Sequence, residues 1–392
     1  MRTLIRDGTI LAPSSEMRGG TLVIEGGRIV DVVPRRLRSG KGEITLNASG
    51  MLVIPGLIDL HIHGCDGHDT MDATPEAQRG MGFFLAQHGV TSYLPTTVAA
   101  SAECVMAAIR NVAATPPAAG EASPLGINLE GPYINPAHAG AQPVQHIRPP
   151  DWSEFETWLA AGPVRMMTVA PELVGAVNLI EGGLARGVAF AVGHSGATYE
   201  QVVAAADHGL GHATHVFNAM VGLHHRDPGC VGAVLDDDRI IAQIIVDEVH
   251  VHPAVVRLLL RVKGVRRTVL ISDAMRAAGL PDGDYDLGGD TICVRGGVAR
   301  TTHGGLAGST LMLDQALRNV IRLSGLTLVQ ALPMATSVPA AALGLTERKG
   351  SLAAGADADI VLLDESLQVR LTLVAGEVVR RPSQTSARGL LN

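Results

Sequence analysis

Two histidines separated by one residue follow a largely apolar run early in the chain, within Leu57–Cys65. Side chains of a β-strand alternate between its two faces, so His61 and His63 would point the same way. Two neutral imidazoles on one face can bind a metal ion through their ring nitrogens. An isolated pair of this kind is often a chance pair at a loop start. The pattern therefore predicts a metal site only if other segments supply further ligands.

Four more candidate ligands or proton carriers stand where later apolar runs end. Glu130 lies in NLEGP, His194 in AVGHSG, His215 in HATHVFNAM and Asp273 in LISDAM. Each residue alone is more often a hydrogen-bonded structural residue. Their shared position, at the ends of strand-like runs, predicts that they converge on one site.

Nitrogen and carboxylate ligands suit Zn²⁺, and also Fe²⁺, Mn²⁺ or Co²⁺. An ion held by Glu130, His194 and His215 with one open position would lower the pKa of a bound water. Asp273 could accept the proton of that water and pass it to a leaving amine. A second ion could use His61 and His63, with Glu130 as a bridge. We expect one or two divalent ions per subunit, with Zn²⁺ favoured.

An alternation of apolar strands and Ala-rich helices positions these residues. We expect eight strands, at Leu57–His61, Thr91–Leu94, Leu125–Glu130, Arg165–Val169, Val188–Gly193, His212–His215, Ile240–Val246 and Thr268–Asp273. Helices are expected between them, for example at Pro75–His88, Ser101–Ala114, Tyr199–Asp207 and Pro253–Val262. Eight such units predict an α/β fold of the TIM (β/α)8 barrel type, whose active sites lie at the carboxyl ends of the strands. A doubly wound open sheet is the alternative, but no GxGxxG motif follows an early strand.

Both ends of the chain read as short strands and turns. Leu4–Ile10, Thr21–Glu25 and Arg28–Val33 alternate in character, and Gly26-Gly27 indicates a hairpin. Near the other end, Ala358–Leu363 and Val369–Val374 are strand-like. Because neither set can form a stable sheet alone, we expect one small β-sandwich domain built from both ends. The expected domains are residues 1–55 and 353–392 for the small β-domain and 56–352 for the barrel.

Loops after the expected sixth and seventh strands carry Arg226 and His250. TIM barrels often bind phosphate in this region, and arginine matches the geometry of an anion. A surface ion pair of Arg226 with Asp227 is the alternative. After the eighth strand, Gly279–Val298 reads as a hairpin excursion at the barrel mouth. Gly304–Ser309 then leads into a helix at Leu311–Leu323, where backbone amides could contact a polar ligand.

Bulk composition excludes several classes of partner. The net charge is −7, and no basic run or aromatic-interleaved patch occurs, so we expect no nucleic-acid partner. Apolar runs are too short to span a membrane, and the start lacks a long apolar segment of the signal-peptide type. Four widely spaced cysteines fit a reducing compartment better than a disulfide framework, so we expect a cytoplasmic protein.

Taken together, the motifs closely resemble the N-acetylglucosamine-6-phosphate deacetylase family of the amidohydrolase superfamily. The resemblance covers nearly the whole chain, through PGLIDLHIHG, LEGPYINP, VAPE, GHSGAT, THVFNAM, HHRDPGCVG, SDAM, LAGSTLMLDQALRN and KGSLAAGADADIV. It implies a barrel with a split β-domain, hydrolysis of an N-acetyl group and a homodimer. Related barrels often use a carboxylated lysine on the fourth strand, but Arg165–Val169 holds no lysine, and Glu130 is the natural substitute.

Site residues follow from the resemblance motif by motif. It implies that Glu130, His194 and His215 hold a metal and that Asp273 is the general acid and base. It further implies substrate contacts in several loops and a sugar phosphate bound partly by the neighbouring subunit. These positions are Ala141, Asn218, Ala219, Arg226, His250, Leu306, Ala307 and Gly308.

One segment departs from the family pattern. The family commonly has Gly-Ala-His or Gly-Thr-His after EGP, with a histidine that contacts the substrate near the acetyl group, whereas this chain has Gln142. Glutamine can donate a hydrogen bond but carries no charge.

The expected reaction converts N-acetyl-D-glucosamine 6-phosphate into D-glucosamine 6-phosphate and acetate. The galactosamine epimer, a related N-acyl amidohydrolase substrate and a catalytically dead barrel scaffold are the alternatives.

Overall fold

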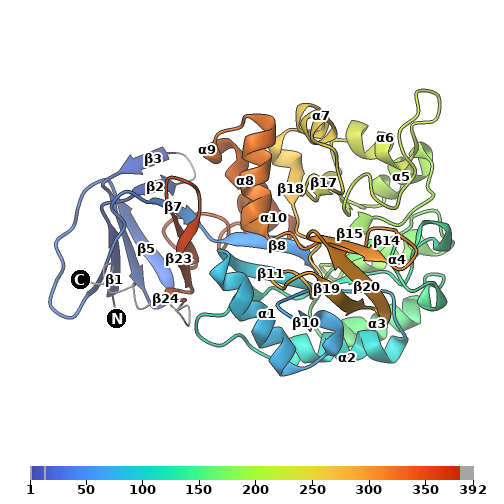
Figure 1. Ribbon diagram of the computed structural model, residues 1–392, viewed down its shortest axis with the longest axis horizontal. Coiled ribbons are helices and arrows are strands. Elements are labelled where there is room, and N and C mark those ends of the chain that lie inside the picture. Colours follow the sequence, from blue (N-terminus) through green and yellow to red (C-terminus); the bar gives the residue numbers. More distant parts are fainter. Residues whose placement is uncertain (1, 13–14, 380–392) are drawn as a thin grey trace.

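The computed structural model describes residues 2–12 and 15–379 and consists of a barrel joined to a smaller pair of sheets (Figure 1). The barrel contains eight parallel strands, and their order around the barrel follows their order in the chain. They are β8 (Leu57–Ile62), β11 (Val90–Thr97), β13 (Ile127–Glu130), β14 (Val164–Val169), β15 (Ala189–Val192), β16 (His212–Ala213), β17 (Ile241–Ile244) and β18 (Thr268–Leu270). The predicted barrel is confirmed, and each predicted strand overlaps one of these eight.

Closure of the barrel runs through the segments that carry the chemistry. The Asp273 amide donates to the His61 carbonyl at 2.9 Å, and the His63 amide donates to the Ala274 carbonyl at 2.9 Å. These bonds join the end of β8 to the segment after β18. The first and last strands of the barrel therefore meet at their carboxyl ends, where His61, His63 and Asp273 lie.

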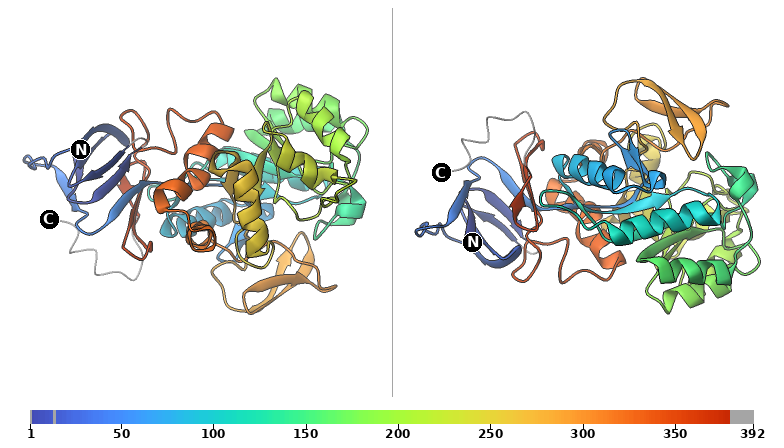
Figure 2. Two further views of the ribbon diagram at one scale, coloured as in Figure 1. Left: turned by 90° about the horizontal axis from the view of Figure 1, so that it is seen from above. Right: turned by 90° about the horizontal axis from the view of Figure 1, so that it is seen from below.

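One helix follows each barrel strand, and the eight helices surround the sheet (Figures 1 and 2). They are α1 (Pro75–Gln87), α2 (Ala102–Ala114), α3 (Trp152–Ala161), α4 (Ala176–Leu184), α5 (Tyr199–Asp207), α6 (Gly229–Asp236), α7 (Pro253–Lys263) and α8 (Leu313–Ser324). The short helices α9 (Leu328–Ala331) and α10 (Ser337–Ala342) follow. Side-chain caps fix several starts: Thr74, Ser101 and Thr198 each accept a backbone N–H of the first turn. Among the described residues, none of these helices has the length and apolar character that crossing a bilayer requires.

The two ends of the chain form two stacked sheets beside the barrel (Figure 1). One sheet has the order β5-β4-β1-β6 and the other β24-β23-β22-β7-β2-β3. The strands are β1 (Arg2–Arg6), β2 (Thr9–Ala12), β3 (Ser15–Arg18), β4 (Thr21–Glu25), β5 (Arg28–Val33), β6 (Ile44–Asn47), β7 (Leu52–Pro55), β22 (Ile360–Leu363), β23 (Val369–Val374) and β24 (Glu377–Val378). The expected pairing of the two ends is confirmed, because β22 pairs with β7.

The expectation of one continuous strand over Leu4–Ile10 is wrong. The chain breaks at Asp7-Gly8, and β1 and β2 join different sheets. Asp7 adopts a left-handed φ of 66°, and a Cβ on Gly8 would lie 2.8 Å from the Cβ of Ala48. The corner is thus set by close tertiary packing, which alternation of residue types does not reveal.

A three-stranded sheet leaves the barrel after β18 and lies over one side of its mouth (Figure 2). Its strands are β19 (Gly283–Leu287), β20 (Asp290–Arg295) and β21 (Val298–Thr301). Leu287, Ile292, Val294 and Ala299 form a core with Met275 from the barrel loop. The predicted excursion is present and has one strand more than a hairpin.

Candidate active site

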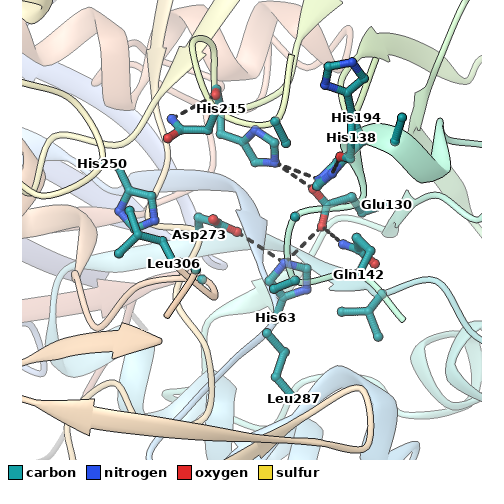
Figure 3. A pocket seen from close by; sticks show the side chains of 18 residues that line it. His63, Glu130, His138, Gln142, His194, His215, His250, Asp273, Leu287 and Leu306 are labelled. Carbon is teal, nitrogen blue, oxygen red and sulfur yellow. Dashed lines mark hydrogen bonds and ion pairs between the residues drawn. The ribbon is translucent and has the colours of Figure 1, made fainter. Parts of the chain in front are cut away.

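Glu130 lies at the centre of a buried group of imidazoles and carboxylates (Figure 3). Its Oε1 atom is 3.0 Å from the Nε2 of His194 and 2.9 Å from the Nε2 of His215. Its Oε2 atom is 3.2 Å from the Nε2 of His63 and 3.5 Å from the Nε2 of His61. Each carboxylate oxygen therefore faces a different pair of histidines.

Asp273 lies on the far side of the second histidine pair. Its Oδ1 atom is 3.2 Å from the Nε2 atoms of both His61 and His63. The structure thus brings together all six residues that the strand ends suggested. They form two groups, Glu130 with His194 and His215, and Asp273 with His61 and His63, each with ligand atoms within 4.8 Å of one another.

Backbone conformation at the strand ends helps to direct these side chains. His194, His215 and Asp273 adopt left-handed φ angles of 48°, 29° and 50°. Non-glycine residues rarely adopt such angles, and those that do concentrate at functional sites. Each residue lies two or three positions beyond its strand, so the chain turns sharply where the side chain enters the site.

The charges of the group stabilise one another. Burial raises the pKa of the Glu130 carboxyl, but the imidazoles of His61 and His194 outweigh burial and hold that pKa well below its usual range. Asp273 behaves alike, since hydrogen bonds from His61 and His63 outweigh its burial and lower its pKa. Burial lowers the pKa of His61, yet Glu130 and Asp273 raise it to about 9. Both carboxylates are therefore ionised at neutral pH.

A divalent cation fits this donor set. The Nε2 atoms of His194 and His215 lie only 3.2 Å apart and both point at the same oxygen of Glu130. Ring nitrogens that converge on one carboxylate oxygen are typical of a transition-metal site. The other ring nitrogens of two histidines are held in turn: Nδ1 of His194 is 2.9 Å from the His138 carbonyl, and Nδ1 of His63 is 3.2 Å from the Thr96 carbonyl.

Sequence reasoning missed several residues that support this group. The carbonyls of His138 and Thr96 contact ligand rings, and the amide of Asn128 lies 3.3 Å from Nδ1 of His61. Asn128 precedes Glu130 by two residues on β13, so strand alternation could have placed it beneath the site. Contacts made by backbone carbonyls could not be predicted, because every residue type has a carbonyl.

A cavity of about 410 Å³ opens beside the group, which is within the range of small-molecule sites. It is lined by five of the six predicted metal ligands and proton carriers and by most of the predicted substrate residues. These are His63, Glu130, His194, His215 and Asp273, with Ala141, Gln142, Asn218, Ala219, His250, Leu306 and Gly308. His61 lies behind them and is fully buried.

Two predicted substrate residues lie elsewhere. Arg226 is exposed on the loop before α6 and does not line the cavity of its own chain. Ala307 is fully buried in the core under the β19–β21 sheet, and its amide donates to the Ala299 carbonyl at 3.2 Å. The structure therefore brings neither residue into the cavity of this subunit.

Gln142 lines the cavity and also contacts Glu130. Its Nε2 donates to Oε2 of Glu130 at 2.6 Å, and its Oε1 accepts the Ala99 amide at 2.7 Å. Both ends of the side chain are thus engaged (Figure 3 shows the contact with Glu130). The predicted contact of Gln142 with substrate stays a prediction, and the amide has a second N–H beside the one that contacts Glu130.

Comparisons with known proteins agree with this geometry. The model of the amidohydrolase family matches residues 52–379. The chain is 38% identical over 378 residues to N-acetylglucosamine-6-phosphate deacetylase of Lysinibacillus sphaericus, covering 96% of this chain and 97% of that protein. It is 42% identical over 330 residues to N-acetylgalactosamine-6-phosphate deacetylase of Escherichia coli O157:H7, covering 83% of this chain and 87% of that protein.

Among solved structures, the fold matches that of N-acetyl-D-glucosamine-6-phosphate deacetylase from Mycobacterium smegmatis. A mutant of that protein in complex with N-acetyl-D-glucosamine-6-phosphate has a TM-score of 0.89 and 36% sequence identity. The match covers 97% of this chain and all of the other, 100%.

Proposed function

The chain belongs to the amidohydrolase family, and we propose that it hydrolyses N-acetyl-D-glucosamine 6-phosphate to D-glucosamine 6-phosphate and acetate. One observation carries the proposal: Glu130 faces two pairs of histidines, with Asp273 beside them, at the wall of a cavity of about 410 Å³. Relatives with that activity match nearly the whole chain, which supports the choice of substrate.

For the metal, we propose Zn²⁺ at Glu130, His194 and His215, with Fe²⁺, Mn²⁺ or Co²⁺ as alternatives. The second group, Asp273 with His61 and His63, would hold a second ion, and Glu130 would serve both through its two oxygens. A divalent ion bound there would lower the pKa of a water and polarise the acetyl carbonyl.

Asp273 is the residue we assign to proton transfer. As an ionised carboxylate at the cavity wall, it would accept a proton from the attacking water as the oxygen bonds to the carbonyl carbon. It would return that proton to the nitrogen as the carbon–nitrogen bond breaks, which releases acetate and the free amine. Asn218 and Ala219, with Leu306 and Gly308 opposite, would position the sugar.

Gln142 bears on how the carbonyl is activated. Because one N–H of its amide contacts Glu130 and the side chain carries no charge, we assign polarisation of the carbonyl mainly to the metal group. The galactosamine epimer is the second candidate substrate, favoured by the relative that is 42% identical and bears that activity in its name. An N-acyl amidohydrolase of other specificity and an inactive scaffold are weaker, since the complete set of ligands and Asp273 lies in one site.

We further propose a homodimer in which Arg226 reaches the partner's site. The loop with Leu223, His224, His225 and Arg226 is exposed, and Leu223 has 57% of its surface accessible. A neighbouring subunit would bury this loop and bring a guanidinium to the phosphate.

Mixed dimers test this arrangement. Arg226→Ala and Asp273→Asn chains would each be weakly active alone. Co-expressed hybrids would regain activity, because one of their two sites combines an intact Asp273 with an intact Arg226 from the other chain. No recovery in verified hybrids would mean that Arg226 acts within its own subunit or not at all.

The chain's organisation and location complete the proposal. We propose a barrel domain at 56–352 and a small β-domain at 1–55 and 353–392, supported by the change of sheet between Pro55 and Leu57. A cytoplasmic location fits a phosphorylated sugar, because charged groups do not partition into a bilayer.

A substrate panel tests the activity. Purified protein loaded with Zn²⁺ is incubated with the 6-phosphates of N-acetyl-D-glucosamine and N-acetyl-D-galactosamine and with an N-acetyl amino acid, and free amine is assayed. The proposal expects the highest kcat/KM for the glucosamine compound. A higher value for the galactosamine epimer would favour the second candidate, and turnover of the amino acid alone would refute both.

A further inference from the structure

A half-buried carboxylate, that of Asp247, contacts His250 on the side away from the cavity. The Nδ1 of His250 lies 2.7 Å from Oδ2 of Asp247. The other oxygen, Oδ1, accepts the backbone amides of Val249 at 2.9 Å and of His250 at 2.8 Å. Glu248 between them adopts a left-handed φ of 67°. The loop after β17 is thus wound around the Asp247 carboxylate, which has no freedom to turn away.

The same histidine forms part of the cavity wall. His250 lines the cavity opposite Gln142 and His194, beside Leu306 (Figure 3). Since Asp247 engages Nδ1, Nε2 is the ring nitrogen left for a molecule in the cavity. Only 6% of the His250 side chain and 14% of the Asp247 side chain are accessible, so the pair is largely shielded from water.

Asp247 also borders a second cavity, of about 390 Å³, on its other side. Asn319 of α8 donates to the Val246 carbonyl at 2.7 Å and so anchors the end of β17 next to Asp247. The carboxylate is therefore held by the backbone of its own loop and by the histidine, and α8 anchors the residue that precedes it.

The contact with Asp247 affects which protonation state of His250 can bind an anion. A neutral imidazole that donates from Nδ1 to a carboxylate has a bare lone pair on Nε2, which would repel an anion. Only the imidazolium donates from both nitrogens. A carboxylate at 2.7 Å favours that charged form.

We propose that Asp247 is a positioning residue that keeps His250 in its imidazolium form, with Nε2–H directed at the anionic group of the substrate. Identification of that group as the sugar phosphate rests on the proposed function. The contact between Nδ1 of His250 and the Asp247 carboxylate does not depend on that identification.

Other charged groups that face His250 are consistent with this assignment. Burial lowers the pKa of His250, but the hydrogen bond and charge of Asp247, together with Asp273 beyond the end of β18, outweigh burial and raise it. Arg300 of β21 acts in the opposite direction. The Asp247 pKa is in turn lowered, since contact with His250 outweighs its burial.

Binding measurements separate the contribution of the phosphate to affinity from that of the rest of the sugar. The metal-loaded protein is titrated with D-glucosamine 6-phosphate and with D-glucosamine, and the ratio of the two Kd values isolates the phosphate. In Asp247→Asn, we expect this ratio to shrink by about tenfold at pH 7.5, because a charge-assisted hydrogen bond becomes a neutral one. KM for the phosphorylated substrate should rise by a similar factor, whereas kcat changes by less than about twofold.

Asp364→Asn is the matched control. Asp364 also accepts two backbone amides, from Ser366 and Gln368, and pairs with one cationic side chain, that of Arg370. It lies in the turn between β22 and β23, away from the cavity. This variant should leave the Kd ratio unchanged. An unchanged ratio in Asp247→Asn, or an equal loss in both variants, would overturn the proposal.

The ring nitrogens of His250 supply a readout that does not depend on the variant's folding. In the wild-type protein at pH 7.5, the ¹⁵N shifts of both ring nitrogens should be those of an imidazolium, and a His250→Gln spectrum assigns the signals. A neutral ring would refute the proposal. If the wild-type protein binds neither sugar while the ring is cationic, the proposed function fails and this inference stands.

Discussion

Glu130 is the residue on which the candidate site depends, because its two oxygens face two different histidine pairs. No other described carboxylate contacts both groups of potential ligands. Asp273 adjoins only the second group, which leaves it able to exchange protons with a molecule in the cavity. These two carboxylates therefore have separable roles.

Substituting Asp273 tests its role in proton transfer. We expect Asp273→Asn to lower kcat by about 10³-fold, because an amide cannot accept a proton from water. The ion held by Glu130, His194 and His215 should remain, as elemental analysis would measure. Activity within tenfold of the wild-type value in a metal-loaded variant would contradict the assignment.

Gln142→Ala addresses the positioning of Glu130. Loss of the 2.6 Å bond should free Oε2 and weaken metal affinity about 10- to 100-fold, as removal of outer contacts of metal ligands does. Competition with a chelator measures this affinity. Gln201→Ala, which alters only the cap of α5, serves as control. Equal affinity in the two variants would show that Gln142 does not support Glu130.

The sequence identified site residues by their type and position, but not the contacts between them. Glu130, His194, His215 and Asp273 stand at strand ends, so their convergence could be predicted from the fold class. The partners of Gln142 and Asp247 could not, because both contacts depend on loop conformations that bring backbone amides and side chains together.

At the scale of elements, the barrel strands could be predicted because most are short, largely apolar runs that alternate with Ala-rich helical stretches. The corner at Asp7-Gly8 could not, since it depends on packing against Ala48. The motif Gly355–Asp359 has a structural role here. Asp357 and Asp359 both pair with Lys349, and the Asp359 carbonyl accepts the Gly56 amide at 2.8 Å.

Strand β16 contributes a buried histidine that should make stability depend on pH. Burial lowers the pKa of His212 to about 4. The unfolded chain, with a pKa near 6.5, binds the proton more tightly, so stability is complete above pH 6.5 and falls as pH decreases toward 4. This contribution amounts to about 3 kcal/mol.

Denaturant unfolding at pH 7.5 and pH 4.5 measures that effect. His212→Gln should reduce the acid-induced loss of unfolding free energy by up to about 3 kcal/mol, whereas His208→Gln, at an exposed histidine, should not. The same acid-induced loss in both variants would contradict the account of β16.

Gly56 joins the small sheets to the barrel with no room for a side chain. A Cβ there would lie 2.1 Å from Oγ1 of the buried Thr91. Gly56→Ala should therefore lower the free energy of unfolding by about 2 kcal/mol. Gly211→Ala, whose Cβ would meet nothing closer than 3.9 Å, is the control for chemical denaturation. Equal free energies of unfolding in Gly56→Ala and Gly211→Ala would show that the junction has room for a side chain.

At the scale of the whole molecule, the fold encloses one reaction site with contributions from distant segments. The barrel strands and the turns that follow them supply the ligands, β19 supplies Leu287, and the loop between β21 and α8 supplies Leu306 and Gly308 to the cavity wall. The small sheets lie at the opposite end of β8 from His61 and His63 and hold its entry in place. The site residues and the supporting small sheets thus lie at opposite ends of the barrel.

Acetate release by protein stripped of metal and reloaded with Zn²⁺ tests the central claim most directly. With N-acetyl-D-glucosamine 6-phosphate as substrate, stripped protein should be inactive and reloaded protein active, and Glu130→Gln should stay inactive after the same treatment. Stripped protein as active as reloaded protein, or an active Glu130→Gln variant, would contradict a metal-dependent deacetylase centred on Glu130.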